Sequence, residues 1–224
     1  MTEVVAKMMS LWPEIALGVG AVLCLMLGLW PSAQVRRQTV WLAGASIIVA
    51  GVLAYMKGIS PRFASPDATV GFGLTMTLFI KVATAVIGFL LLLVAAQLPD
   101  SHPQIAAADL PSGGITPSKT DPAIIFRGEF FAFFLLSLAG VMLVAEADDL
   151  VWLFLALELV SLPTYVMVAI SRSKSVAQEA AVKYFFLGAL AVAIFLYGFT
   201  LIYGATGVTR FADIRQFASM YPPR

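Results

Sequence analysis

Six long apolar segments, separated by shorter polar stretches, dominate the hydropathy pattern of the chain. We place them at Leu11–Trp30, Gln38–Met56, Leu74–Leu98, Glu129–Ala145, Leu150–Ile170 and Ala177–Gly204. About 20 residues of α-helix cross a hydrocarbon core of about 30 Å, and each segment is close to that length or longer. Lipid offers no partner for an unpaired backbone group, and no segment alternates as the strands of a barrel do. The pattern therefore predicts an all-α, polytopic transmembrane helix bundle with about six spans.

Two regions outside these segments are more polar. Residues 99–128 are dense in Pro, Ser, Gly, Asp and Thr, which predicts a polar loop. In the tail, Phe211, Ile214 and Phe217 recur at helical spacing, so we expect a short helix in the membrane interface. The chain thus divides into a three-helix N-terminal membrane segment, the polar loop, a second three-helix group and an interfacial tail, with the ranges 1–98, 99–128, 129–207 and 208–224.

The composition fits a lipid environment and excludes several kinds of site. Apolar residues make up 60% of the chain and charged residues 12%, whereas a soluble domain carries about 25% charged residues. The net charge of +1, without a basic stripe, argues against nucleic-acid binding. One cysteine, one histidine and no glycine-rich nucleotide fingerprint argue against an intrachain disulfide, a metal site or a cofactor site. We therefore expect neither catalytic residues nor metal ligands in this chain.

Basic residues in the short connections give an orientation. Arg36-Arg37 and Arg172/Lys174 fall on one side of a six-helix arrangement, whereas the turn at 146–149 on the other side has no basic residue. The positive-inside rule then places the basic connections in the cytoplasm. Both ends of the chain are therefore expected outside.

Four of the ionisable residues within the predicted spans are candidates for a function, because a charge at the helix centre costs about 2.5–3.5 kcal/mol. Glu14 stands at the start of the first helix, where its carboxylate complements the helix dipole and can reach water. Lys81 lies about two turns into the third span, and its long side chain can extend to the interface. We expect structural roles for both.

Glu158 is different because it lies about 12 Å from one end of its helix and about 18 Å from the other. Its short side chain cannot reach the interface, so it must be protonated, paired with a cation or facing internal water. Pro163 cannot donate to the Leu159 carbonyl, which leaves a loosened turn beside the acid. A neutral glutamate that only joins helices is the alternative, but Ser or Thr does that at lower cost. We therefore predict a functional role for Glu158.

Lys183 begins the last predicted span. Glu179 stands four residues earlier, in the order that favours a helix ion pair, and such a pair explains the lysine adequately. In a helical hairpin its ammonium can also extend toward Glu158 across roughly 10 Å, a gap that one or two waters would fill. The two interpretations, a surface ion pair and part of a proton relay, both stay open.

The second half of the chain closely resembles a known family. RGEFFAFFLLSLAGVMLVAEADDLVWLFLALELVSLPTYVMVAI, followed by QEAAVKYFFLGALAVAIFLYGFTLIYGATG, is similar to the N chain of the proton-pumping NADH–quinone oxidoreductase, respiratory complex I. The resemblance is specific from Arg127 to Gly207 and loose before that. It implies that Glu158, in the LELxSLPxY motif, and Lys183, in the EAAxKYF motif, belong to a membrane proton path. Residues 129–207 would then be the start of an antiporter-like proton-translocation module.

The resemblance also implies a setting for the chain. It would be a non-redox subunit of a translocase in an energy-transducing membrane, most simply a bacterial inner membrane, and would contribute to proton translocation coupled to quinone reduction. NAD, FMN, iron–sulfur clusters and quinone would bind to partner subunits, and the other membrane subunits of complex I and the lipid bilayer would surround the chain. Two alternatives stay open: a subunit of a multi-chain Na⁺/H⁺ antiporter, and a structural scaffold that does not pump.

The chain departs from this family in length. Family members are more than twice as long, with a second, inverted helix repeat and a broken helix whose lysine partners the glutamate. We therefore expect a fragment, a split gene product that needs a second polypeptide for the missing helices, or a truncated paralogue. By itself the chain is expected to be inactive as a pump.

Overall fold

The computed structural model describes residues 11–30, 38–59, 68–97, 127–170 and 175–220. Its helices are α2 (Trp12–Gly28), α4 (Thr39–Ile59), α5 (Ala68–Gln97), α8 (Arg127–Val144), α9 (Leu150–Ile170), α10 (Ser175–Thr206) and α11 (Phe211–Met220). Within these residues there is no sheet, and one isolated antiparallel bridge joins Asp149 to Arg210. The predicted all-α fold is confirmed.

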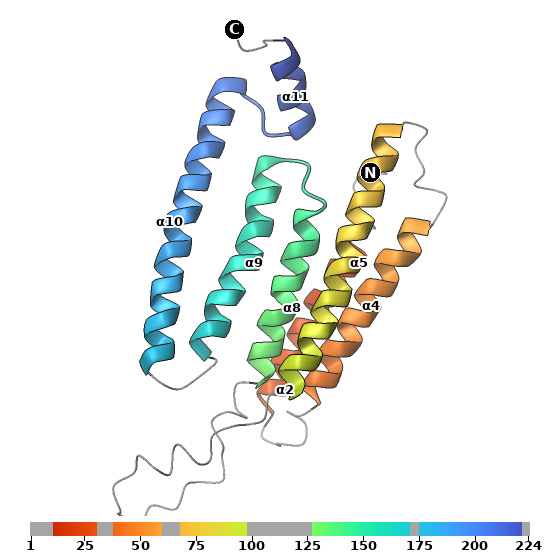
Figure 1. Ribbon diagram of the computed structural model, residues 1–224, viewed down its shortest axis with the longest axis vertical. Helices are drawn as coiled ribbons and strands as arrows, with labels where there is room; N and C mark the ends of the chain where they lie inside the picture. The colour runs from red at the N-terminus through yellow and green to blue at the C-terminus, as the bar shows by residue number, and fades with distance from the viewer. Residues whose placement is uncertain (1–10, 31–37, 60–67, 98–126, 171–174, 221–224) are drawn as a thin grey trace, which may run out of the picture.

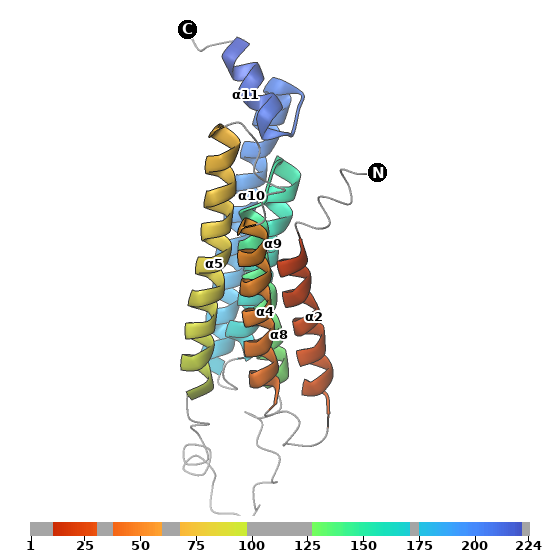
Figure 2. The same ribbon diagram turned by 90° about the vertical axis from the view of Figure 1, so that its right-hand side faces the viewer.

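Helices α2 to α10 stand side by side, and the short α11 lies at one end of the bundle (Figure 1). In Figure 1, α10 forms one edge, α9 and α8 follow, and α5 and α4 lie at the other edge. Figure 2 shows that α2 begins at the same end of the bundle as α11. The most extensive contacts are those of α8 with α2 and with α9, while α10 packs against α9. Helix α8 therefore connects the N-terminal helices to the α9–α10 pair.

The helix lengths fit a membrane. Among the described residues, four helices contain stretches that are long and apolar enough to cross a membrane, at Thr39–Met56, Met76–Ala96, Leu150–Ile170 and Gln178–Thr206. Helices α2 and α8 are apolar but shorter. The predicted bounds of α9 agree with the structure, and the largest difference is at α5, which begins at Ala68 rather than at Leu74. The chain is a bundle of transmembrane helices.

Some predicted features lie outside the described residues. These are the polar loop, with the sole histidine, and the connections whose basic residues gave the orientation. The predicted tail helix is present as α11, which has no buried residue, and its position in the membrane interface stays a prediction. The connection between α8 and α9 is tight, as predicted, and makes the two helices adjacent.

The core of the bundle lies where α8 meets α2 and α4. Leu135 and Met142 of α8 are fully buried, and so are Leu17 of α2 and Ile47 of α4. Lipid tails are as apolar as these side chains, so burial alone gives membrane helices little reason to associate. Association depends instead on close packing, and α8 has the contacts that provide it.

Two glycines let α8 approach its neighbours closely. A Cβ atom added at Gly140 would lie 2.7 Å from the backbone nitrogen of Val160 in α9. A Cβ atom added at Gly128 would lie 2.4 Å from the Cα atom of Gly28 in α2. The obstructing atoms belong to the backbone, which cannot rotate away as a side chain can. Only glycine therefore permits these two helix contacts.

We predict that Gly140→Ala separates α8 from α9 and lowers the free energy of unfolding by about 1–3 kcal/mol, the usual cost of overpacking. Unfolding by SDS, followed by circular dichroism in mixed micelles, measures this. Gly18→Ala is the matched control, because no atom lies within 4 Å of a Cβ there, and alanine favours a helix. Equal stabilities of the two variants would contradict the packing argument.

Candidate functional site

Glu158 lies in the middle of α9, the helix that packs against α8 and against α10. Its side chain is half-buried, and no ion pair or hydrogen bond reaches it from the part of the chain that the structure describes. An acidic side chain that deep in a membrane helix, without a charge partner, is a functional candidate because its ionised form is costly there.

Pro163 interrupts the hydrogen bonding of α9 just beyond Glu158. It has no amide donor for the Leu159 carbonyl. The next carbonyl, that of Val160, accepts a hydrogen bond from the Ser137 hydroxyl of α8 at 3.3 Å. Helix α9 continues beyond this turn, and the loosened turn that the sequence predicts there stays a prediction. Ser137 thus attaches α8 to the turn that the proline loosens.

Lys183 lies on the exposed side of α10. Its Nζ atom is 2.5 Å from Oε1 of Glu179, and the two side chains are 70% and 64% exposed. The helix ion pair that the spacing predicts is therefore present. Within the described residues no ion pair joins Lys183 to Glu158. A role for Lys183 in a proton path requires its side chain to leave Glu179, and this role stays a prediction.

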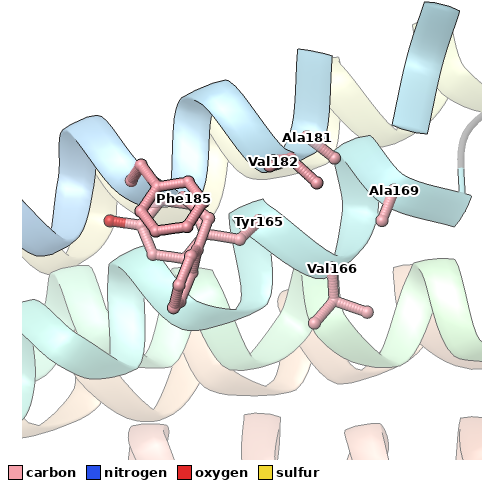
Figure 3. Close-up of a pocket in the computed structure, with 7 residues that line it drawn as sticks. Tyr165, Val166, Ala169, Ala181, Val182 and Phe185 are labelled. Atoms are coloured by element: carbon pink, nitrogen blue, oxygen red, sulfur yellow. The ribbon is translucent and has the colours of Figure 1, made fainter. Parts of the chain in front are cut away.

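An apolar cleft of about 330 Å³ lies between α9 and α10. Tyr165 packs edge-on against Phe185, with 5.7 Å between the ring centroids, and also against Tyr184. Figure 3 shows side chains from the two helices facing this cleft, namely Tyr165, Val166, Ala169, Ala181, Val182 and Phe185. None of the lining side chains is charged. The cleft therefore belongs to the packing of α9 against α10, and its lining contains no charged group that could act as a catalytic acid or base.

A second group of charges is buried at the end of the bundle where α8 turns into α9. Oε1 of Glu14, in α2, is 2.7 Å from Nζ of Lys81, in α5. Lys81 also forms an ion pair with Glu146, in the turn after α8. Glu14 is 5% exposed and Lys81 is 4% exposed. The expectations that Glu14 reaches water and that Lys81 extends to the interface are wrong.

The position of Lys81 along α5 explains this correction. Because α5 begins at Ala68, Lys81 lies well inside the helix, and α2 and the α8–α9 turn cover it. The sequence contained one usable signal. In an antiparallel bundle, Glu14, Lys81 and Glu146 all fall near the same end of their spans, and opposite charges at one level of a membrane protein pair with one another.

The family comparison agrees with this fold. A family model described as "NADH:quinone oxidoreductase/Mrp antiporter, TM" matches residues 147–222, which contain Glu158, Pro163 and Lys183. The fold and this match define the class of the protein: a membrane helix bundle of the kind shared by NADH:quinone oxidoreductases and Mrp antiporters.

Curated relatives match this chain, two of them over nearly its whole length. NADH-quinone oxidoreductase subunit N of Alkalilimnicola ehrlichii is 34% identical over 209 residues, which are 92% of this chain and 38% of the relative. Subunit N of Ruthia magnifica is 32% identical over 216 residues, 94% of this chain and 40% of the relative. That of Thiobacillus denitrificans is 49% identical over 90 residues, 40% of this chain and 19% of the relative. The chain therefore belongs to the family of NADH-quinone oxidoreductase subunit N. It spans about two fifths of the length of the first two relatives, since the aligned residues are 38% and 40% of them.

We predict that Lys81→Met lowers the free energy of unfolding by about 3–5 kcal/mol, because it leaves buried carboxylates without their cation. Lys183→Met is the matched control. It removes an exposed lysine from a pair within one helix, and such pairs contribute little to stability. SDS titration of both variants, followed by circular dichroism, gives the comparison. Wild-type stability of Lys81→Met would show that the buried pairs do not hold α2 and α5 in place.

Proposed function

We propose that this chain is a membrane-arm subunit, or part of one, of a NADH–quinone oxidoreductase, and that it contributes to proton translocation coupled to quinone reduction. The names of its relatives support the assignment to that complex. The chemistry of translocation is assigned here to Glu158. The observation that carries this step is a half-buried carboxylate in the middle of α9, without a partner among the described residues.

Glu158 acts as the proton carrier in this proposal. Without a nearby cation it holds a proton, because ionisation at this depth is costly. Approach of a cation stabilises the carboxylate and releases the proton, and withdrawal of the cation allows another proton to bind. Lys183, one helix away, can supply this cation when its side chain turns from Glu179 toward α9.

The turn before Pro163 gives water a route to the acid. It has a carbonyl without its regular donor, at Leu159, and two hydroxyl groups. The Ser161 hydroxyl donates to the Leu157 carbonyl at 2.9 Å, and that of Thr164 donates to the Ser161 carbonyl at 2.6 Å. Polar atoms are therefore concentrated on α9 within two turns of Glu158, where water molecules can bind and pass protons.

The redox chemistry belongs to partner subunits in this proposal. NADH, FMN, iron–sulfur clusters and quinone would bind there, while this chain acts within the lipid bilayer beside the other membrane subunits. Among the described residues no group of three His, Cys, Asp or Glu side chains is placed to hold a metal ion. The membrane would be a bacterial inner membrane, with both ends of the chain on the periplasmic side.

A subunit of an Mrp-type Na⁺/H⁺ antiporter is the second candidate, and the description of the matching family model supports it. The same carboxylate would then exchange protons in a transporter without a quinone reaction. The relatives named above favour the oxidoreductase, because all three are subunits of that complex. The third candidate is a structural scaffold without a proton-carrying residue, and the following test distinguishes it from a proton-pumping subunit.

We predict that Glu158→Gln, in the assembled membrane complex that contains this chain, removes most of the proton pumping driven by NADH. Glutamine keeps the shape and the hydrogen bonding of the side chain but cannot titrate. Glu158→Asp is the matched control, since it keeps a carboxyl group and should retain part of the pumping. Inverted membrane vesicles with a pH-sensitive dye report pumping, and blue native gels report assembly.

Undiminished pumping by a normally assembled Glu158→Gln complex would exclude the carrier role and leave Glu158 as a structural residue. Proton uptake that needs Na⁺ but neither NADH nor quinone would instead assign the chain to an antiporter.

A further inference from the structure

The buried cluster of Glu14, Lys81 and Glu146 has no part in the mechanism proposed for Glu158. It joins three separate elements: α2, α5 and the turn between α8 and α9. Both carboxylates contact the same ammonium nitrogen, so they lie within a few ångströms of each other. Ionisable groups at such a short distance from each other exchange protons readily when one of them can reach water.

The Glu14 carboxylate is buried and poorly supplied with donors. Glu14 is 95% buried, since only 5% of it is exposed, and its Oε1 and Oε2 atoms are both fully buried without a hydrogen-bond partner. Its Oε1 atom faces Lys81 at 2.7 Å. A buried carboxylate oxygen without a donor costs a large part of the hydration energy of the ion. Protonation of Glu14 removes most of this energetic cost, so the surroundings of Glu14 favour uptake of a proton.

The other end of the cluster is partly exposed. The Glu146 side chain is 17% exposed, and Asp148, two residues on, is exposed in the same turn. Asp149 accepts a hydrogen bond from the Trp152 amide at the start of α9. The remaining acid of α8, Glu129, stands at the opposite end of that helix. Arg210, just before α11, also lies beside this turn, because its backbone pairs with that of Asp149.

We propose that Glu14, Lys81 and Glu146 form a second proton-binding site, in which Glu14 takes up a proton that enters from water at the α8–α9 turn. Glu146 first gains a proton from water. The Lys81 ammonium then gives one proton to the Glu14 carboxylate, breaking an N–H bond and forming an O–H bond. The resulting amine takes the proton from Glu146. At the end Lys81 is again an ammonium, Glu146 is again a carboxylate, and Glu14 is a neutral acid.

A proton fits this site better than a metal ion does. Sodium or calcium requires several oxygen ligands around it. Here an ammonium group occupies the space beside Oε1 of Glu14, and it repels a second cation. The nearby Thr77 hydroxyl already donates to the Ala145 carbonyl at 3.2 Å. The proposal does not depend on the function proposed for Glu158, because it concerns binding of a proton and not pumping.

Infrared difference spectroscopy tests this proposal on the full chain in lipid nanodiscs. Spectra are recorded in a Glu158→Gln background, so that the acid of α9 does not contribute. The pH is changed from about 9 to about 6, above the range in which exposed carboxylates, with pKa values of about 4, take up protons. We expect a carbonyl band of a protonated carboxylic acid at the lower pH. Glu14→Gln should remove it, and Glu179→Gln, at an exposed carboxylate, should leave it unchanged.

Two further variants locate the proton and its route. Glu14→Asp should keep the band but shift its frequency, which provides a test if Glu14→Gln does not fold. Glu146→Gln should keep the band but slow its shift after transfer into heavy water, because the entry group is lost. A chain without the band, or a band that Glu14→Gln leaves unchanged, would overturn the site. Exchange at the wild-type rate in Glu146→Gln would overturn the route through Glu146.

Discussion

The close packing of α8 between α2 and α9 is the constraint on which the rest of the structure depends. In lipid, helices associate through tight contacts rather than through burial of apolar surface. Gly128 brings α8 against Gly28 of α2, and Gly140 brings it against the backbone of α9. The surroundings of Glu158 and the cluster of Glu14, Lys81 and Glu146 both depend on the position of α8. If α8 moved outward, Ser137 would leave the Val160 carbonyl, and Glu146 would leave Lys81.

Two acidic side chains, Glu14 and Glu158, have different surroundings in the bundle. Glu14 is almost fully enclosed and forms an ion pair with Lys81. Glu158 is half-buried and has no such partner among the described residues. A paired acid contributes to holding helices together, whereas an acid without a partner changes its protonation when its surroundings change. This difference makes Glu158 the stronger candidate for a proton carrier. A proton relay through Lys81 instead requires proton entry at the partly exposed Glu146.

Helix α10 is attached on one side, through its contacts with α9. Within its apolar stretch, Gln178–Thr206, Ala181 is buried against α9, whereas large side chains such as Phe186 and Leu187 are more than half exposed, at 67% and 68%. A surface of this kind suits lipid or further membrane helices and does not suit water. The ion pair of Lys183 with Glu179 lies at one end of this surface, so whatever covers α10 also determines where the lysine points.

The amino-acid sequence by itself determined the membrane helices, the bounds of α9 and the depth of Glu158. Each of these is a property of one segment, because a helix in lipid satisfies its own backbone hydrogen bonds and its hydrophobic length alone decides whether it spans. The Lys183–Glu179 pair is equally local, since it joins residues one turn apart. Only the tertiary structure decided that Lys81 is buried and pairs with Glu14 and Glu146. Its burial depends on where α5 begins, on which helices stand beside it and on their relative heights in the membrane. Those heights are set by side-chain packing between segments far apart in the chain, and no pattern within a single segment contains that information.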